Sequence, residues 1–284
     1  MSRFPKVIMV KILKKERLAE NISRIIVAAP HIAKAAKPGQ FIVIIPTENA
    51  ERIPLTIADK DLEKGTISII FQIVGATTKL LDSIPAGGEI AHLLGPLGVP
   101  SHIEKFGTVV VIGGGVGIAE IYPVVKGLKE AGNKVVTIIG ARCKEMLVYQ
   151  EELRIASSEL KVTTDNGACG RKGFVSDELK DMIATGEKID LVIAVGPVPM
   201  MRVCCDVTKP HGIKTMVSLN PIMLDATGMC GVCRVSVGGQ TKFACVEGPE
   251  FDGHQVDFAD LVARLKPYKD VEKKAFDHVC RLLK

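Results

Sequence analysis

The sequence predicts a β plus α/β protein, with an antiparallel β-barrel domain, a parallel-sheet domain and a small C-terminal subdomain. Short β-rich runs separated by turn signals fill residues 1–100. Strands then alternate with helical segments through residues 101–221, as in βαβ units. Closely spaced cysteines mark residues 222–284. A chain of 284 residues is long enough for two or three such domains.

The composition is that of a globular protein with an aliphatic core, because 47% of residues are apolar and there is no tryptophan. Net charge is +5, and no Lys/Arg block is interleaved with aromatic residues, so a nucleic-acid partner is not favoured. The longest apolar run, Gly107–Ala119, falls short of the roughly 20 residues of a membrane span. The N-terminus lacks a signal-peptide core, and we expect a cytoplasmic protein without membrane contact.

The β domain is predicted from four strands: Val7–Leu13, Ile22–Ala28, Phe41–Ile45 and Thr66–Val74. Turn signals such as Lys37-Pro38-Gly39 separate these strands, and short strands at regular spacing are typical of a small barrel or sandwich. One helix is expected at Thr78–Ile84, and the Gly95–Pro100 segment is the expected boundary.

The second domain begins with a buried strand at Thr108–Ile112 and a glycine-rich turn. The elements expected after it are helix Ile118–Ala131, strand Lys134–Ile139, strand Lys161–Thr164, helix Ser176–Ala184, strand Leu191–Val195, helix Pro199–Val207 and strand Lys214–Ser218. This alternation predicts a parallel sheet with helices on both faces.

After residue 221 we expect a cysteine-bearing loop, a hairpin and two helices. The hairpin strands are Arg234–Val237 and Thr241–Cys245, turned by Gly238-Gly239. The helices are expected near Phe258–Leu265 and Val271–Leu283.

The strongest chemical motif is Asp225-x4-Cys230-x2-Cys233-x11-Cys245. Two cysteines three apart on a glycine-containing loop can present both thiolates to one ion or cluster, and the hairpin returns a third. Asp225 stands where a C-x4-C-x2-C run has its first cysteine, so we hypothesise an Asp/Cys3 [2Fe–2S] site. The alternatives are a zinc site, unligated thiols, or an Asp225 that only bonds its own loop backbone.

The second motif is the turn Gly113-Gly114-Gly115-Val116-Gly117-Ile118, between a strand and a helix. This arrangement places backbone N–H groups beside a phosphate, although a tight turn without a ligand has the same pattern. The next strand ends in Gly140-Ala141-Arg142 without an acidic residue, so the ordinary rule for ribose recognition does not apply.

Two weaker signals lie in the β domain. The segments are Arg52-Ile53-Pro54-Leu55-Thr56 and Ile73-Val74-Gly75-Ala76-Thr77-Thr78. Both place small or hydroxyl residues where the backbone could approach a ligand, and the second opens the predicted helix. A plain loop is the alternative for each.

Taken in order, these motifs resemble the ferredoxin–NADP reductase superfamily over essentially the whole chain. Within it they are similar to the iron–sulfur subunit of dihydroorotate dehydrogenase B, and more so to the small subunit of NADH-dependent ferredoxin:NADP oxidoreductases, which are electron-bifurcating transhydrogenases. The resemblance implies an FAD domain at 1–100, an NAD(H) domain at 101–221 and a [2Fe–2S] subdomain at 222–284. Asp225 in place of a fourth cysteine favours the transhydrogenase.

The resemblance also implies roles for individual residues. Pro54, Leu55 and Thr56 match the segment against the flavin, and Thr77 and Thr78 match the pair that holds the FAD pyrophosphate. Gly196-Pro197 match a Cys-Gly-Pro element near the nicotinamide, with Val195 replacing its cysteine. Arg52 is one residue away from the usual flavin arginine, and Glu120 stands where relatives often have Pro. The expected cofactor contacts are Arg52, Pro54, Leu55, Thr56, Ile73, Val74, Gly75, Thr77, Thr78, Gly113, Gly114, Gly115, Gly117, Ile118, Gly140, Ala141, Arg142, Asp165, Gly196 and Pro197.

The function implied is that of an electron-transfer flavoprotein subunit. The protein positions NAD(H) and FAD so that hydride passes between them, and no catalytic side chain is needed. Electrons continue through the [2Fe–2S] cluster and into a larger flavin and [4Fe–4S] subunit, which forms a heterodimer with this chain and serves ferredoxin. Arg142 could instead indicate NADP. The rivals are the electron-transfer subunit of dihydroorotate dehydrogenase B or another reductase, and a non-catalytic zinc-binding module with a nucleotide fold.

Overall fold

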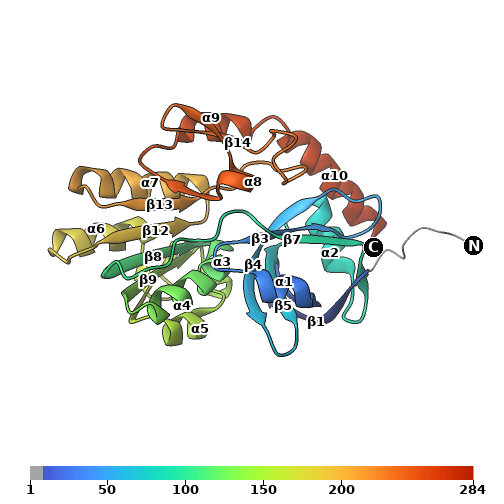
Figure 1. The fold of residues 1–284 in the computed structure, drawn as a ribbon, viewed down its shortest axis with the longest axis horizontal. Coiled ribbons are helices and arrows are strands. Elements are labelled where there is room, and N and C mark those ends of the chain that lie inside the picture. The colour runs from blue at the N-terminus through green and yellow to red at the C-terminus, as the bar shows by residue number, and fades with distance from the viewer. Residues whose placement is uncertain (1–8, 284) are drawn as a thin grey trace, which may run out of the picture.

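The structure is a computed structural model that describes residues 9–283, and it begins with an antiparallel barrel (Figure 1). Val7 and Ile8 of the first predicted strand lie outside the described residues. The barrel strands run in the order β6-β1-β2-β5-β4-β3-β7. Their bounds are β1 Val10–Ala19, β2 Ile22–Ala28, β3 Phe41–Ile45, β4 Ile53–Asp61, β5 Thr66–Gln72, β6 Glu89–Ile90 and β7 His92–Leu97.

The barrel closes through one continuous segment. The edge strands β6 and β7 are joined by Ala91 alone, so the first and last strands of the order are covalent neighbours. Isoleucine supplies much of the interior, as in the β2–β5 pair of Ile25 and Ile69, both fully buried. Closure leaves few open sheet edges, and β-branched side chains suit the pleated interior. Helices α1 Pro30–Ala35 and α2 Ala76–Ser83 connect the strands.

The second domain is a seven-stranded sheet in the order β11-β10-β9-β8-β12-β13-β16. Its strands are β8 Thr108–Gly114, β9 Lys134–Ala141, β10 Glu159–Thr164, β11 Arg171–Lys172, β12 Leu191–Val195, β13 Thr215–Ser218 and β16 Glu250–Asp252. All neighbours are parallel except β16, which pairs antiparallel with β13 through Ser218 and Glu250. The central strand β8 is apolar and almost wholly buried, as expected of a strand covered on both faces.

Helices cover both faces of this sheet (Figure 1). They are α3 Gly117–Glu120, α4 Tyr122–Glu130, η1 Lys144–Met146, α5 Gln150–Ala156, α6 Val175–Ala184, α7 Val198–Thr208 and η2 Lys209–His211. The predicted single helix Ile118–Ala131 is wrong, because the chain forms α3 and α4 with Ile121 between them. Pro123 in the first turn of α4 explains the break, since proline has no N–H and favours a helix start.

The C-terminal segment holds hairpin β14 Arg234–Val237 and β15 Gln240–Phe243, then α8 Ala244–Glu247, α9 Phe258–Arg264 and α10 Lys269–Leu282. Gly238 and Gly239 turn the hairpin with φ of +60° and +73°. Cys245 was predicted to end the second strand, but it lies in α8. The Glu247 carboxylate accepts the Phe243 N–H at 2.7 Å, and this starts the helical turn instead.

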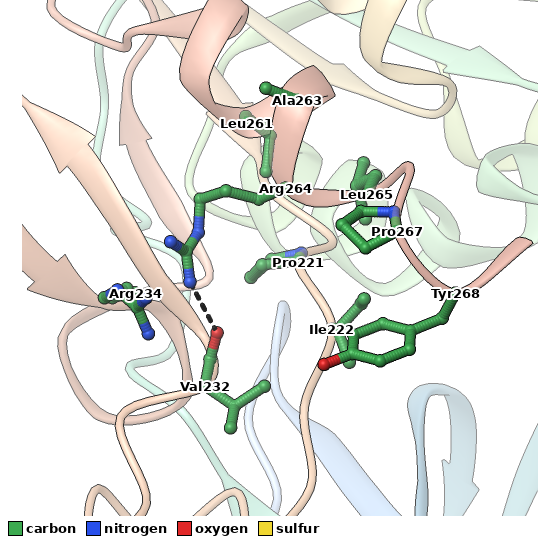
Figure 2. Close-up of a pocket in the computed structure, with 10 residues that line it drawn as sticks. All are labelled: Pro221, Ile222, Val232, Arg234, Leu261, Ala263, Arg264, Leu265, Pro267 and Tyr268. Atoms are coloured by element: carbon green, nitrogen blue, oxygen red, sulfur yellow. Dashed lines mark hydrogen bonds between the residues drawn. The ribbon is translucent and has the colours of Figure 1, made fainter.

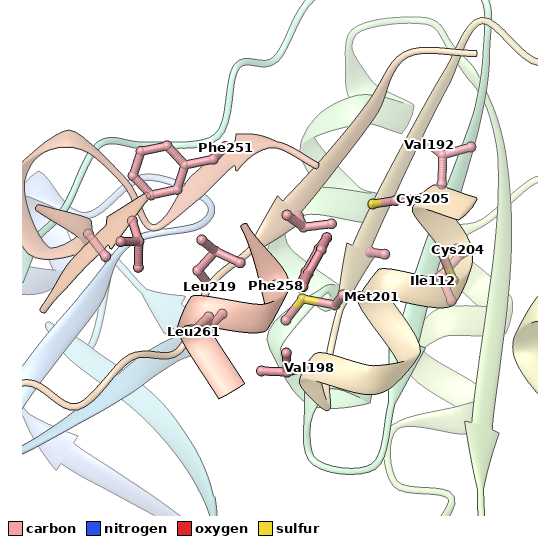
Figure 3. Close-up of a cluster of buried hydrophobic side chains, with 14 of the residues drawn as sticks. Ile112, Val192, Val198, Met201, Cys204, Cys205, Leu219, Phe251, Phe258 and Leu261 are labelled. Carbon is pink, nitrogen blue, oxygen red and sulfur yellow. The ribbon is translucent and has the colours of Figure 1, made fainter. Parts of the chain in front are cut away.

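One apolar core joins the sheet to the C-terminal segment (Figure 3). Met201 and Cys204 of α7 and Phe258 and Leu261 of α9 are buried in it. Burial raises the pKa of Cys204 to about 12, so this thiol is a core side chain without nucleophilic character. The predicted fold class is confirmed. Along residues 9–283, no helix combines the length and the apolar character that a membrane crossing needs.

Candidate functional site

A cavity of about 340 Å³ lies between the barrel and the α/β sheet. Strand β4 contributes Pro54, Leu55 and Thr56 to its wall. The opposite wall is formed by the chain from the end of β8 into α3 and by Gly196-Pro197 after β12. We call it the interdomain cavity. It brings together two groups of residues that the sequence predicts as cofactor contacts, from segments far apart in the chain.

The glycines of the turn allow α3 to approach the end of β12. A Cβ on Gly117 would lie 2.4 Å from the Val195 carbonyl oxygen, and one on Gly114 would lie 2.3 Å from the Met200 sulfur. Gly115 has φ of +59° and open space around it, and its N–H donates to the Gly140 carbonyl at 3.0 Å. Gly115 therefore forms the turn, whereas Gly117 and Gly114 provide close packing.

A larger cleft of about 890 Å³ opens at the carboxyl ends of β8, β9 and β10. Gly140, Ala141, Arg142 and Asp165 line it, as the sequence predicts for a nucleotide site at this edge. The start of α6 and part of α7 complete the wall. Gln72, Gly114, Gly115 and Pro197 line both the cleft and the interdomain cavity. The two spaces therefore meet at the end of β8.

The start of α2 forms a separate feature. The Thr78 hydroxyl accepts the N–H groups of Val74 at 3.1 Å and of Gly75 at 3.0 Å, and it donates to the Gly75 carbonyl at 2.8 Å. This pattern fixes the first turn of the helix. Ile73, Val74, Gly75, Thr77 and Thr78 line neither cavity. The contact of Thr77 and Thr78 with the FAD pyrophosphate, and the cofactor contacts of Ile73, Val74 and Gly75, remain predictions.

The cysteine loop is shaped by three residues with positive φ: Ala226, Gly228 and Gly231. Asp225 faces two partners. One of its oxygens lies 3.3 Å from Nη1 of Arg52, and the other accepts hydrogen bonds from the Thr227 hydroxyl and backbone. The Thr227 hydroxyl is the main cause of the lowered pKa of Asp225, so this side chain is a carboxylate. Arg52 thereby connects the start of β4 to the cysteine loop.

The candidate thiols differ in their surroundings. The Cys233 and Cys245 sulfurs are buried and lie 3.2 Å apart, and burial followed by the neighbouring thiol raises the pKa of Cys245 to about 12. Cys230 is exposed, and backbone N–H groups of Val232 and Asp225 lower its pKa. A [2Fe–2S] cluster takes two protein ligands on each iron, and Cys233 with Cys245 suits one such pair.

The four predicted ligands are assembled only in part. Within residues 9–283, no three His, Cys, Asp or Glu side chains converge as ligands of one metal ion. Behind the loop, a groove of about 400 Å³ separates it from α9 (Figure 2). There Arg264 donates to the Val232 carbonyl at 3.4 Å and so ties α9 to the loop. The groove contains none of the four predicted ligands.

Several lining residues were missed by the sequence analysis. Gly113 and Ile118, which were predicted as contacts, are buried and line neither cavity. The rule that parallel strands present ligands at their carboxyl ends could have found Ser218, the last residue of β13, and Asn220 after it. The missed residues of the interdomain cavity are Phe41, Gln72, Val116, Glu120, Ser218, Leu219, Asn220, Pro221, Met223 and Pro249.

Comparisons with known proteins match both parts of this arrangement. A model of the oxidoreductase NAD-binding domain matches residues 111–206, and a model of the iron–sulfur cluster binding domain of dihydroorotate dehydrogenase B matches residues 220–257. An electron transfer subunit homologue of dihydroorotate dehydrogenase B from Thermotoga maritima is 46% identical over 94% of each chain. The corresponding subunit from Enterococcus faecalis is 31% identical over 87% of this chain and 97% of that protein.

A solved structure is also similar to this chain in sequence and fold. A chain in the structure of an NADH-dependent reduced ferredoxin-NADP oxidoreductase, studied for flavin-based electron bifurcation, is 45% identical to this chain. The alignment covers 99% of this chain and 100% of that chain, with a TM-score of 0.91.

Proposed function

Since this chain belongs to the family of dihydroorotate dehydrogenase B electron-transfer subunits and their homologues, we propose that it works in an NADH-dependent ferredoxin:NADP oxidoreductase. It is an oxidoreductase subunit for NAD(H)-linked electron transfer, and its cofactors are FAD, NAD(H) and a [2Fe–2S] cluster. We propose below which complex this chain serves and which of its residues hold each cofactor.

The observation that carries the proposal is the shared wall of the two cavities. Gln72, Gly114, Gly115 and Pro197 line both, so a dinucleotide in the cleft can extend one end into the interdomain cavity. The flavin, when bound, supplies an acceptor of hydride that can release electrons singly. The protein's own part is positioning. The glycines admit close approach, and Pro54, Leu55 and Thr56 support the opposite side.

The route from this cavity to the cluster runs over a short stretch of chain. Arg52 lies just before β4, whose residues 54–56 line the cavity, and its guanidinium contacts Asp225 at 3.3 Å. Met223, two residues before Asp225, lines the same cavity. We propose Asp225, Cys230, Cys233 and Cys245 as the cluster ligands. The iron–sulfur family model spans all four, which favours a cluster over a zinc ion.

The chain serves a larger assembly, because its relatives are electron transfer subunits. We propose a heterodimer with a larger subunit that carries a second flavin and [4Fe–4S] clusters, reduces or oxidises NADP(H), and exchanges electrons with ferredoxin. Dihydroorotate dehydrogenase is the alternative partner. The ferredoxin-NADP oxidoreductase chain is 45% identical, and the Enterococcus faecalis subunit of dihydroorotate dehydrogenase B is 31% identical. The 46% relative from Thermotoga maritima is named only as a homologue of that subunit, so these identities favour the first partner. A reducing compartment such as the cytoplasm suits eight unpaired cysteines among the described residues.

The proposal is tested by anaerobic purification of the chain with its partner. Iron and acid-labile sulfide should be equimolar at about two per chain, and NADH should bleach the flavin absorbance. Zinc without sulfide, or a flavin that NADH does not bleach, would overturn the electron-transfer assignment. Addition of dihydroorotate in place of NADPH distinguishes the two partners, since only the matching substrate reduces the complex.

The Asp225 assignment needs a variant with a matched control. Asp225→Ala should lower the iron content or change the electron paramagnetic resonance spectrum of the reduced cluster. Asp206→Ala removes an exposed carboxylate of α7 that pairs with Arg202 at 3.8 Å, away from the loop, and should leave both unchanged. Equal spectra and iron contents for Asp225→Ala and the unmodified protein would remove Asp225 from the ligand set.

A further inference from the structure

Glu120 is the only ionisable side chain among the residues that line the interdomain cavity. The rest of the lining is apolar, glycine, proline or neutral polar. Its neighbours Ile118, Ala119 and Ile121 are fully buried, so the end of α3 is held firmly in the core. Glu120 itself is half-buried. A partly desolvated acid in such a lining has an energetic cost, and this cost calls for a function.

The backbone and the cavity lining set the position of Glu120. The Ile121 N–H donates to the Gly117 carbonyl at 3.1 Å, which closes the turn that carries Glu120. Thr56 of β4 lines the same cavity from the barrel. Glu120 and Thr56 therefore belong to opposite walls of the interdomain cavity.

Burial raises the pKa of Glu120 above its ordinary value, and the Thr56 hydrogen bond only partly opposes this. The elements packed on α3 carry charged groups, and none of these shifts the pKa of Glu120. On β4 and α4 those groups are Asp59, Lys60, Asp61, Lys126, Lys129 and Glu130. Lys126 pairs with Asp59 at 3.5 Å. Strands β8 and β12 carry no ionisable residue.

We propose that Glu120 is a proton-holding positioning residue that couples the charge of the interdomain cavity to pH. This inference rests on the proposed function, because it assumes that the flavin occupies this cavity. Transfer of a hydride into the cavity brings two electrons and one proton, and therefore one net negative charge. An ionised Glu120 opposes that charge, because two negative charges in one cavity repel each other. Uptake of one proton from solvent by the carboxylate restores the balance.

The test is the midpoint potential of the flavin in the purified complex, measured by spectroelectrochemistry from about pH 5.5 to pH 9. Glu120→Gln keeps the shape and removes the ionisation. Above the pKa of Glu120, the unmodified protein should be harder to reduce than Glu120→Gln by about tenfold in equilibrium constant, about 30 mV for a two-electron couple. At low pH the two potentials should converge. Glu130→Gln, on the exposed end of α4, is the control and should match the unmodified protein at every pH.

Identical pH dependence in Glu120→Gln and the unmodified protein would overturn the coupling. A purely structural role would change stability and leave the difference in pH dependence absent. If Glu120→Gln loses its flavin, Glu120→Asp keeps an ionisable group on a shorter side chain, so the break in the potential should persist. A potential of Glu120→Asp without such a break overturns the proposal. An unmodified complex without flavin contradicts the proposed function instead, and this is seen before any variant is made.

Discussion

Gly117→Ala tests whether the close approach of α3 to β12 shapes the cofactor site. The added Cβ would lie 2.4 Å from the carbonyl oxygen of Val195, 2.9 Å from its carbonyl carbon and 3.1 Å from Cα of Gly196. All three atoms belong to the backbone, so no side chain can rotate away. Ordinary contacts lie near 3.5–4.0 Å, and α3 must therefore retreat by about 1 Å.

The expected change in the free energy of unfolding follows from two opposing effects. Forcing an extra methyl group into a packed core costs about 1–3 kcal/mol, and contact with backbone atoms, which cannot rotate away, favours the upper end. The replacement of Gly by Ala in a helix gains up to about 1 kcal/mol. We expect a net loss of about 2 kcal/mol in the free energy of unfolding. At about 2–4 °C per kcal/mol, Tm falls by about 4–8 °C.

Gly127→Ala is the matched control. Gly127 lies inside α4, and its added Cβ would meet Pro38 at 3.5 Å and Ile103 at 3.6 Å, which are ordinary contacts. The same chemical change should therefore raise stability by about 1 kcal/mol. Thermal unfolding by circular dichroism measures both effects, and NADH titration measures the site. Only Gly117→Ala should weaken NADH binding, because it displaces the turn that lines both cavities.

A change in Tm of the same sign in both variants would refute this reasoning. If Gly117→Ala raises Tm as Gly127→Ala does, the contact with Val195 does not limit the position of α3. An unchanged NADH affinity with a lowered Tm would separate the packing of the turn from the nucleotide site. The second outcome would leave the glycine run as a structural turn.

Three other changes have defined outcomes. Asp82→Asn weakens the hydrogen bonds from Ser23 and from Arg17, both 2.6 Å, and should cost about 1.5–3 kcal/mol in urea unfolding at pH 7. Burial alone would raise the pKa of Asp82, but these bonds outweigh it and the folded pKa lies below the unfolded value of about 3.9. The stabilisation is therefore complete above that pH and is lost as pH falls through the folded pKa; a difference that persists in strong acid would contradict this. Phe258→Ala should cost about 3–5 kcal/mol in thermal unfolding, because this ring is 8% exposed in the core of Figure 3, and a cost below about 1 kcal/mol would disprove that packing. Gly228→Ala should cost about 1–2 kcal/mol and lower the iron bound per chain, since its φ is +87°; unchanged iron and Tm would show that the loop tolerates the side chain.

Local patterns in the sequence were sufficient for the main architecture. The strand and glycine turn around Gly113–Gly117 indicated the βαβ unit because hydrophobic runs and glycines act over a few residues. The split at Ile121 could also have been found, since Pro123 signals a new helix start. Strand β16 could not, because three residues carry no periodicity and its partner β13 lies far away in the sequence.

In the candidate site too, local sequence patterns predict some residues, whereas others depend on contacts between distant parts of the chain. Gly140–Arg142 lie at the carboxyl end of β9 and Gly196-Pro197 follow β12, and the parallel-sheet rule places them in the cleft and the cavity. Arg52 contacts a residue 173 positions away, and no local pattern connects it to Asp225. Glu120 belongs to a four-residue helix, too short to indicate which face meets the barrel. Its place in the cavity wall opposite Thr56 of the barrel becomes visible only in three dimensions.

The antiparallel addition of β16 to β13 has a topological consequence. Ser218 pairs with Glu250, and the Leu219 N–H donates to the Pro249 carbonyl at 2.9 Å. The cysteine-bearing stretch between them is therefore a long insertion whose two ends are held together in the sheet. A protease cut at Gly238-Gly239 would leave both fragments anchored to one sheet. The nicked chain should therefore stay in one piece during gel filtration and separate only in denaturant. The cysteine-bearing stretch could therefore release the proposed cluster and still stay anchored to the sheet.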